Sequence, residues 1–258
     1  MKQAILIVRE FDKFSEILAE ADFETINFPA IRTLPVENLD ELDEKLDKIN
    51  KFDGLFFTSP KAAEVFLSRF REKNFDFHGK VYVLGDRTKR LFENTDFETV
   101  FRENANTAEE FINSFEKSEF AGKTFLFLRG DKSLRAIPEI LKNIATIEES
   151  IVYRTEKIAV EIDEINQLRE KFEAGEIAAA CFFSPSAAES FLEQFGAEIA
   201  HQIVIATIGK TTAEYFERQS VKVGFVSSKS NAEKFAIELI EYLRENLPTK
   251  YTKGTKKE

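Results

Sequence analysis

The sequence predicts an α/β fold with two similar parallel-sheet domains, and two observations support this prediction. First, short apolar runs alternate with segments of helical periodicity, such as 62–70, where Val65, Phe66 and Phe70 recur at helical spacing. Second, blocks of sequence recur about 124 residues apart. Strands that alternate with helices pair in parallel through right-handed crossovers, so we expect sheets covered by helices on both faces. The expected strands are 4–8, 55–58, 81–84, 99–101, 124–128, 178–183, 203–208 and 222–226.

Length and composition are those of a globular protein large enough for two domains. The 258 residues are 43% hydrophobic and 32% charged, and the net charge of −10 argues against a general nucleic-acid binder. The longest apolar run, 177–183, is too short to cross a membrane and the first residues lack a signal-peptide core, so we expect a cytoplasmic protein without a membrane partner. One Cys and two His exclude an internal disulfide and a zinc-ligand cluster, and we expect no metal and no other cofactor.

The internal repeat is the most informative feature. Three blocks recur in one register, with Ser59-Pro60 falling on Ser184-Pro185 and Gly85 on Gly209. The matched blocks are 56–64 with 182–189, 83–88 with 207–212, and 108–111 with 232–235. Chance rarely produces such a series, so we interpret the pattern as a duplicated α/β unit.

A fourth pair breaks the linear order and defines the domain organisation. The block 5–9 resembles 125–129, so one strand–helix unit opens the chain in one copy and closes the series in the other. We therefore expect two flavodoxin-like domains, one discontinuous (1–31 plus 156–247) and one continuous (35–147). The extended segments 25–34 and 148–155, rich in β-branched and aromatic residues, are expected to join them as a two-stranded β linker and hinge. The polar, lysine-rich tail 248–258 is expected to be disordered rather than a nucleic-acid arm.

The repeated blocks lie where ligands bind in open α/β sheets, beyond the carboxyl ends of the strands. Ser59-Pro60 and Ser184-Pro185 follow a strand and open a helix, with serine as the N-cap and proline at the first helical position. Gly85 and Gly209 end strands where the backbone turns tightly. We expect these helix amino termini, with spare N–H donors, to face a cleft between the domains, an arrangement that favours anions.

Basic residues share these loops, so we expect an acidic protein with a locally positive cleft. They are Arg9, Lys61, Arg87, Arg129, Lys132, Lys210 and Lys229. Taken singly, a Ser-Pro pair is usually only a helix cap and a loop lysine is usually solvated. The recurrence of the set at matching positions is what favours a binding site. Asn231, the expected cap of the last helix, belongs to the same set.

Other chemistries fail on position. Cys181 lies inside an apolar strand, where we expect an inert buried thiol rather than a nucleophile. His78 and His201 precede their strands, at the wrong edge of the sheets for a site. No glycine-rich nucleotide-binding motif is present in the sequence.

Together these residues resemble the uroporphyrinogen-III synthase family. The resemblance rests on FFSPSA at 182–187, IGKTTA at 208–213 and VYRT at 152–155, and it spans nearly the whole chain. Each motif is short and degenerate, and their order, spacing and combination make the match specific. The copies in the middle domain, such as Gly85-Asp86-Arg87-Thr88, diverge more.

The resemblance implies a lyase of porphyrin and heme biosynthesis that acts on hydroxymethylbilane, a linear tetrapyrrole with acetate and propionate groups on every ring. Loss of water gives an azafulvene, which the substituted α-carbon of ring D attacks. The resulting spiro-pyrrolenine fragments and recloses to uroporphyrinogen III with that ring inverted. The uncatalysed product is the type I isomer, and a 100:1 preference for type III needs only about 2.7 kcal/mol. Orientation of the polycarboxylate in the interdomain cleft would supply this preference.

The resemblance also implies residue roles. Tyr153 matches the family's favoured proton donor for hydroxyl loss, and the alternative is a packed hinge aromatic with its hydroxyl hydrogen-bonded; both stay open. The residues expected to line the substrate carboxylates, largely through backbone N–H groups, are Ser184, Pro185, Ser186, Gly209, Thr211 and Thr212. The repeated loops add Arg9, Ser59, Pro60, Lys61, Gly85, Arg129, Lys210 and Asn231 as substrate-binding candidates.

A non-enzymatic two-domain ligand-binding or sensor protein is the competing interpretation. Sugar-binding proteins and repressor sensor cores also have two α/β domains joined by crossing strands. The sequence shows neither a secretion signal nor a helix-turn-helix extension, and the repeat with Ser-Pro caps is not expected in that class. For the enzyme we expect transient hand-over of substrate from hydroxymethylbilane synthase and no nucleic-acid partner. We expect a monomer, because no exposed apolar stripe stands out.

Overall fold

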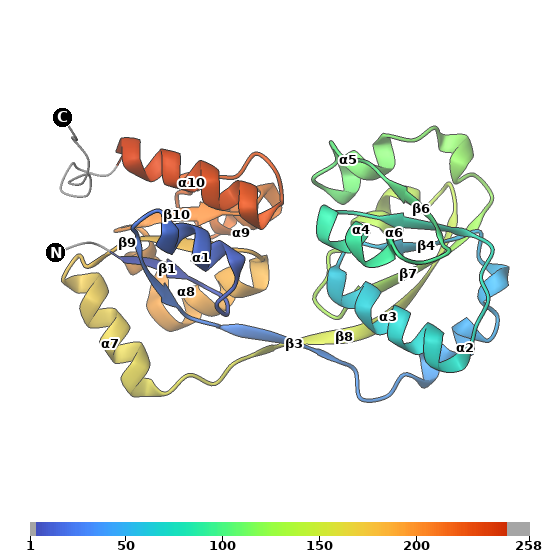
Figure 1. The fold of residues 1–258 in the computed structure, drawn as a ribbon, viewed down its shortest axis with the longest axis horizontal. Coiled ribbons are helices and arrows are strands. Elements are labelled where there is room, and N and C mark those ends of the chain that lie inside the picture. The colour runs from blue at the N-terminus through green and yellow to red at the C-terminus, as the bar shows by residue number, and fades with distance from the viewer. Residues whose placement is uncertain (1–3, 247–258) are drawn as a thin grey trace. The chain divides into compact units, whose positions relative to one another are not determined.

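The computed structural model describes residues 4–246, which divide into two compact units. Unit 1 takes its described residues from both ends of the chain, up to Arg32 and from Lys157 onward, and unit 2 is Thr33–Glu156. Each unit contains a sheet flanked by helices (Figure 1). One sheet contains β1 (Ala4–Ile7), β2 (Glu24–Asn27), β9 (Ile177–Phe182), β10 (Val204–Thr207) and β11 (Phe225–Val226). The other contains β3 (Ile31–Pro35), β4 (Gly54–Phe57), β5 (Lys80–Val83), β6 (Glu98–Phe101), β7 (Thr124–Gly130) and β8 (Thr146–Lys157).

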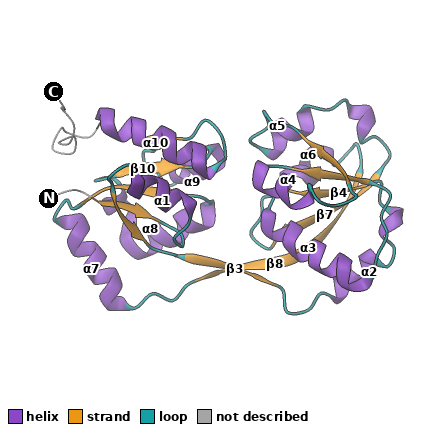
Figure 2. Ribbon diagram, viewed as in Figure 1, coloured by secondary structure: helices purple, strands orange, loops and turns teal. Residues whose placement is uncertain are grey.

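Helices alternate with these strands along the chain, as the prediction requires (Figure 2). Unit 1 has α1 (Lys13–Glu20), α7 (Ile162–Glu173), α8 (Pro185–Ala200), α9 (Lys210–Arg218) and α10 (Ala232–Asn246). Unit 2 has α2 (Asp40–Leu46), α3 (Pro60–Lys73), α4 (Asp86–Phe92), α5 (Ala108–Asn113) and α6 (Ala136–Leu141), with 3-10 turns at Ile49–Lys51 and Lys117–Glu119. The long α8 is interrupted by a kink at Gly196.

The strand orders confirm the prediction of two parallel sheets. The first sheet has the order β11-β10-β9-β1-β2 and the second the order β3-β8-β7-β4-β5-β6. All pairs in the first sheet, and those from β8 to β6 in the second, are parallel. Thus β9-β10-β11 match β4-β5-β6 and β1-β2 match β7-β8, the permuted order that the sequence repeat indicates. Counted along the chain, the strands of the first sheet have the flavodoxin-like order 2-1-3-4-5, whereas β4 to β8 of the second sheet have the order 3-2-1-4-5. Counted in the order of the repeat, both sheets have the order 3-2-1-4-5.

Both faces of each sheet are buried, which explains the continuous apolar runs. In β4, Leu55 and Phe57 pack on one face with α2, α3 and α4, whereas Phe56 packs on the other with α5 and α6. In β1, Leu6 packs on the face covered by α7, α8 and α9, whereas Ile5 packs with α1 and α10. The alternation of side chains along each strand therefore builds a core on either side.

The segments expected to form the linker differ from the prediction. Thr25 and Ile26 pair with Ile5 and Leu6, so the start of the predicted segment 25–34 is the edge strand β2 of the first sheet. Among the strands of residues 4–246, only β3 and β8, which are neighbours in the second sheet, run across the boundary between the units. β8 is also longer than 148–155, because its first part pairs with β7 from Thr146 onward. The predicted tail 248–258 lies outside the described residues.

Candidate active site

The carboxyl edge of the unit 1 sheet gathers most of the predicted site residues. Because its strands are parallel, the loops that follow β1, β9, β10 and β11 leave from the same edge. These loops and the helix starts after them carry Arg9, Ser184, Pro185, Ser186, Gly209, Lys210, Thr211, Thr212 and Asn231. The structure thus brings together, within unit 1, residues spread over more than two hundred positions of sequence.

Three of the helices that begin at this edge, α8, α9 and α10, have different caps. The Ser184 Oγ accepts the Ala187 N–H at 3.2 Å, and Pro185 occupies the first turn of α8. The Asn231 Oδ1 accepts the Lys234 N–H at 3.0 Å before α10. α9 follows Gly209 and has no side-chain cap. The first N–H groups of an α-helix lack intrahelical acceptors, so Thr211 and Thr212 supply backbone donors suited to a carboxylate.

Gly209 is closely packed by the neighbouring loop. A Cβ at this position would lie 2.7 Å from the Ser230 Oγ. Its φ of −176° is extended backbone, so the requirement for glycine is one of space. The loop before Ser230 is anchored by Glu238, whose carboxylate accepts hydrogen bonds from the Ser227 Oγ (3.0 Å) and the Ser228 N–H (2.9 Å). Burial raises the pKa of Glu238, but hydrogen bonds from Ser228 and Ser227 lower it by more. The pKa of Glu238 is therefore below its usual value.

Arg9 contacts Asp12 and Phe183 in unit 1. Its guanidinium lies 2.8 Å from the Asp12 carboxylate, and its Cζ lies 4.3 Å from the centre of the Phe183 ring. A cation over an aromatic face is stabilised by the ring quadrupole. The Arg9 side chain as a whole is 25% exposed at this edge of the sheet.

The carboxyl edge of the unit 2 sheet carries the other predicted residues. Ser59 and Pro60 follow β4 and begin α3, but Ser59 makes no side-chain cap bond. The Lys61 ammonium lies 3.5 Å from the Glu64 carboxylate. Gly85 follows β5 with φ of 87°, a conformation that favours glycine, and open space surrounds the position of its absent Cβ.

Arg129, predicted to bind substrate, is engaged within unit 2. Its Nε donates to the Glu149 carboxylate at 2.6 Å and its Nη1 donates to the Gly130 carbonyl at 2.9 Å. Its side chain is only 12% exposed, whereas Arg135, absent from the predicted set, binds the same carboxylate and is 55% exposed. Burial raises the pKa of Glu149, but the hydrogen bonds and charges of Arg135 and Arg129 lower it by more. The pKa of Glu149 is therefore below its usual value. The partner of Arg129 lies twenty residues away in sequence, and nothing in the repeat indicates it.

Tyr153 is the aromatic residue of β8 that the family resemblance singles out. It is 8% exposed and packs in the core shared with β4 and β7. Its hydroxyl lies 3.5 Å from the Ser133 Oγ, at the outer limit of a hydrogen bond. Ser133 is not among the residues predicted from the sequence. Its position could have indicated a role, because it lies just beyond the strand end at 130, in the loop equivalent to the one that follows Arg9.

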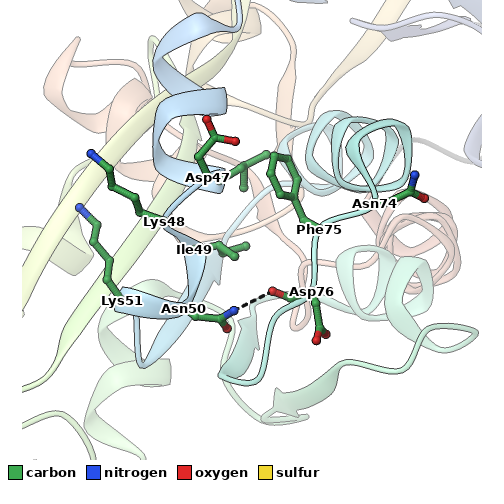
Figure 3. A pocket seen from close by; sticks show the side chains of 9 residues that line it. Asp47, Lys48, Ile49, Asn50, Lys51, Asn74, Phe75 and Asp76 are labelled. Carbon is green, nitrogen blue, oxygen red and sulfur yellow. Dashed lines mark hydrogen bonds between the residues drawn. The ribbon is translucent and has the colours of Figure 1, made fainter.

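Other parts of the molecule hold no predicted site residue. Burial raises the pKa of the Cys181 thiol, in agreement with an inert group. A shallow pocket formed by 46–51 and 74–76 precedes β4 and β5, at the opposite edge of the unit 2 sheet, and the Asn50 amide donates to the Asp76 carbonyl there (Figure 3). Within residues 4–246, no group of three or more His, Cys, Asp or Glu side chains is arranged to hold a metal ion. None of the helices described is long and apolar enough to span a membrane.

The fold and these loops define a class: a duplicated parallel α/β protein with helix amino termini and cations at the carboxyl edge of each sheet. The model of the family described as uroporphyrinogen-III synthase HemD matches residues 12–236, so the chain belongs to the uroporphyrinogen-III synthase family. This confirms the resemblance found in the sequence.

Individual relatives agree with this assignment. The uroporphyrinogen-III synthase of Chlorobaculum parvum is 28% identical over 250 residues, covering 94% of this chain and 96% of that protein. A mutant uroporphyrinogen III synthase from Thermus thermophilus has a TM-score of 0.66 at 13% identity, covering 94% of this chain and all of the other. The Helicobacter pylori uroporphyrinogen-III synthetase has a TM-score of 0.61 at 22% identity, with the same coverage. These two structures show that the fold is shared.

Proposed function

We propose that this chain cyclises hydroxymethylbilane to uroporphyrinogen III, with inversion of ring D and loss of water. Membership of the family is the observation that carries the proposal. The gathering of N–H donors and cations at the carboxyl edge of each sheet supports it, because the substrate bears acetate and propionate groups on every ring.

Substrate binding in this proposal uses the loops of both units. In unit 1 the backbone N–H groups of Thr211 and Thr212 and the exposed part of Arg9 bind carboxylates. In unit 2 Lys61 and the start of α3 do the same, and Arg135 rather than Arg129 supplies the more exposed guanidinium. A substrate held at several carboxylates closes in one orientation, so the selectivity for type III arises from positioning.

The reaction then needs one proton donor. Tyr153 protonates the terminal hydroxyl, the carbon–oxygen bond breaks, and water leaves. The carbon that carried the hydroxyl becomes the electrophilic carbon of an azafulvenium. The substituted α-carbon of ring D attacks it to give the spiro-pyrrolenine, and the bond from ring D to its original bridging carbon breaks. Ring D recloses on that bridging carbon through its other α-carbon, which loses a proton to the Tyr153 phenolate. The balance is one water lost and one tyrosine regenerated.

The test supplies freshly made hydroxymethylbilane to the purified chain and separates the uroporphyrinogen isomers after oxidation to porphyrins. The expected result is mostly type III, formed faster than type I appears in a buffer control. Only type I at the buffer rate would refute the proposal and favour a non-enzymatic ligand-binding protein.

We further propose that the chain acts as a cytoplasmic monomer and receives its substrate from hydroxymethylbilane synthase by transient hand-over. Hand-over would keep the substrate from closing spontaneously to the type I isomer, as free hydroxymethylbilane does. The test compares two mixtures at increasing dilution: this chain with hydroxymethylbilane synthase, and this chain with added free hydroxymethylbilane. The fraction of type I product should rise less on dilution in the first mixture than in the second. An equal rise in the two mixtures would argue against hand-over. Sedimentation of the chain as a dimer would refute the proposal that it is a monomer.

A further inference from the structure

The ring of Tyr153 lies against the backbone of Gly130. The two residues are register partners in β8 and β7, and the register shifts between Arg129 and Gly130. A Cβ on Gly130 would lie 2.4 Å from Cε2 and Cζ of the Tyr153 ring and 2.8 Å from its hydroxyl. Such distances are far below van der Waals contact, so any residue larger than glycine at this position would displace the ring.

The hydroxyl of Tyr153 has a polar neighbour on the same loop. The Ser133 Oγ accepts the Gly130 N–H at 3.0 Å and lies 3.5 Å from the Tyr153 hydroxyl. With one lone pair of Ser133 engaged by Gly130, the Ser133 hydrogen can point to the tyrosine oxygen. In that direction the tyrosine keeps its own proton for another acceptor.

The 130–133 loop is hydrogen-bonded to β8 at Tyr153 and at Thr155. The Asp131 N–H donates to the Tyr153 carbonyl at 3.1 Å, and the Thr155 N–H donates to the Asp131 Oδ1 at 2.9 Å. The Arg129 Nη1 binds the Gly130 carbonyl while its Nε binds Glu149. The loop is therefore braced independently of any ligand, which accounts for the engagement of Arg129.

We propose that Gly130 and Ser133 are positioning residues that fix the Tyr153 hydroxyl as the proton donor of the cyclisation. Gly130 provides the space for the ring, and Ser133 donates to the hydroxyl and stabilises the phenolate that remains after proton transfer. This inference rests on the proposed function. It excludes a role of Tyr153 limited to packing.

The test is a double-mutant cycle with Tyr153→Phe, measuring kcat, KM and unfolding by urea for each variant. Gly130→Ala keeps the tyrosine hydroxyl but displaces it, so its kcat should fall by about a hundredfold, as in Tyr153→Phe, with KM changed by less than about threefold. The double variant should be no slower than Tyr153→Phe alone, because the displaced group is already absent.

Ser133 gives a second arm that does not depend on a backbone change. Ser133→Ala should lower kcat by about tenfold, the equivalent of one hydrogen bond in the transition state, and Ser133→Thr should restore most of it. Ser68, exposed on α3 and bonded to Glu72, is the matched control, and Ser68→Ala should leave kcat unchanged.

The outcomes separate the two proposals. If the unaltered chain forms no type III isomer, the proposed function fails. If it forms type III but Gly130→Ala retains full kcat while folded, the inference is overturned. It is also overturned if the losses of Gly130→Ala and Tyr153→Phe multiply in the double variant, or if Ser133→Ala changes only KM or the free energy of unfolding.

Discussion

The two units carry the same loops at equivalent strand ends but stabilise them differently. Ser184 caps its own helix through its side chain, whereas Ser59 at the matching position makes no such bond. Gly209 is pressed against Ser230, whereas the matching Gly85 has open space and a positive φ. A duplicated motif therefore keeps its place in the fold without keeping its contacts, and each copy needs its own functional assignment.

The arginines that follow the matching strands β1 and β7 differ in the same way. Arg9 pairs with the partly exposed Asp12, whereas Arg129 is largely buried and pairs with Glu149. The Arg9 position therefore suits a substrate contact, and the Arg129 position suits a brace of the loop. Four comparisons test this contrast.

The largest effect should come from displacing the loop at Gly209. Gly209→Val should lower kcat/KM by about a hundredfold, since its Cβ collides with Ser230, whereas Thr211→Ala should cost only a few-fold because the backbone N–H remains. As a control, the milder loss in Gly209→Ala should be relieved by adding Ser230→Ala, which removes the atom at 2.7 Å. Equal losses from Gly209→Val and Thr211→Ala would argue against binding through the backbone.

The arginines should separate stability from binding. Arg129→Ala leaves the half-buried Glu149 paired with the more exposed Arg135. The substitution should lower the free energy of unfolding by about 2 kcal/mol. Arg9→Ala breaks a more exposed pair and should cost about 0.5 kcal/mol, but it should raise KM several-fold. Urea unfolding and steady-state kinetics on both variants measure the difference. A reversed pattern would exchange the two roles.

A smaller effect is expected on the loss of stability at acid pH. The pKa values of Glu149 in unit 2 and Glu238 in unit 1 are both lowered by folding. Each carboxylate therefore contributes stability above its ordinary pKa of 4.5, and this contribution is lost as the pH falls below that value. Glu149→Gln and Glu238→Gln should each flatten the fall in unfolding free energy between about pH 5 and pH 3. An unchanged slope in either variant would show that its carboxylate is not stabilised by folding.

The smallest effect is expected at the helix caps. Ser184→Ala removes a hydrogen bond to Ala187 and should cost about 1 kcal/mol, whereas Ser59→Ala should cost less than about 0.5 kcal/mol. If Ser59 binds a substrate carboxylate, Ser59→Ala should instead raise KM. Equal stability losses at the two serines would contradict the difference in capping.

The fold was predictable because the repeat and the apolar runs are local signals. Ser59-Pro60 and Ser184-Pro185 placed two strand ends in register, and the permuted block 5–9 predicted the swapped strand order that the sheets show. The sequence alone predicts a linker over the β2 segment, because an edge strand and a crossing strand have the same β-branched composition. The pairing of β2 with β1, for example of Thr25 with Ile5, distinguishes them.

The site was predictable only to the level of loops. The sequence placed Arg9, Gly209 and Tyr153 at strand ends, but contacts across the fold decide what each does. The pairing of Arg129 with Glu149 and the space for Tyr153 over Gly130 depend on how β7 and β8 align, including a register shift. Spacing along one chain does not encode such alignment.

The central claim is that orientation of the substrate, and not the proton donor, selects the isomer. The most direct measurement is the isomer composition formed from hydroxymethylbilane in a single turnover, with enzyme in excess, by the unaltered chain and by Tyr153→Phe. The account predicts type III from both, with the variant only slower. Type III from the unaltered chain but type I from the variant would contradict it.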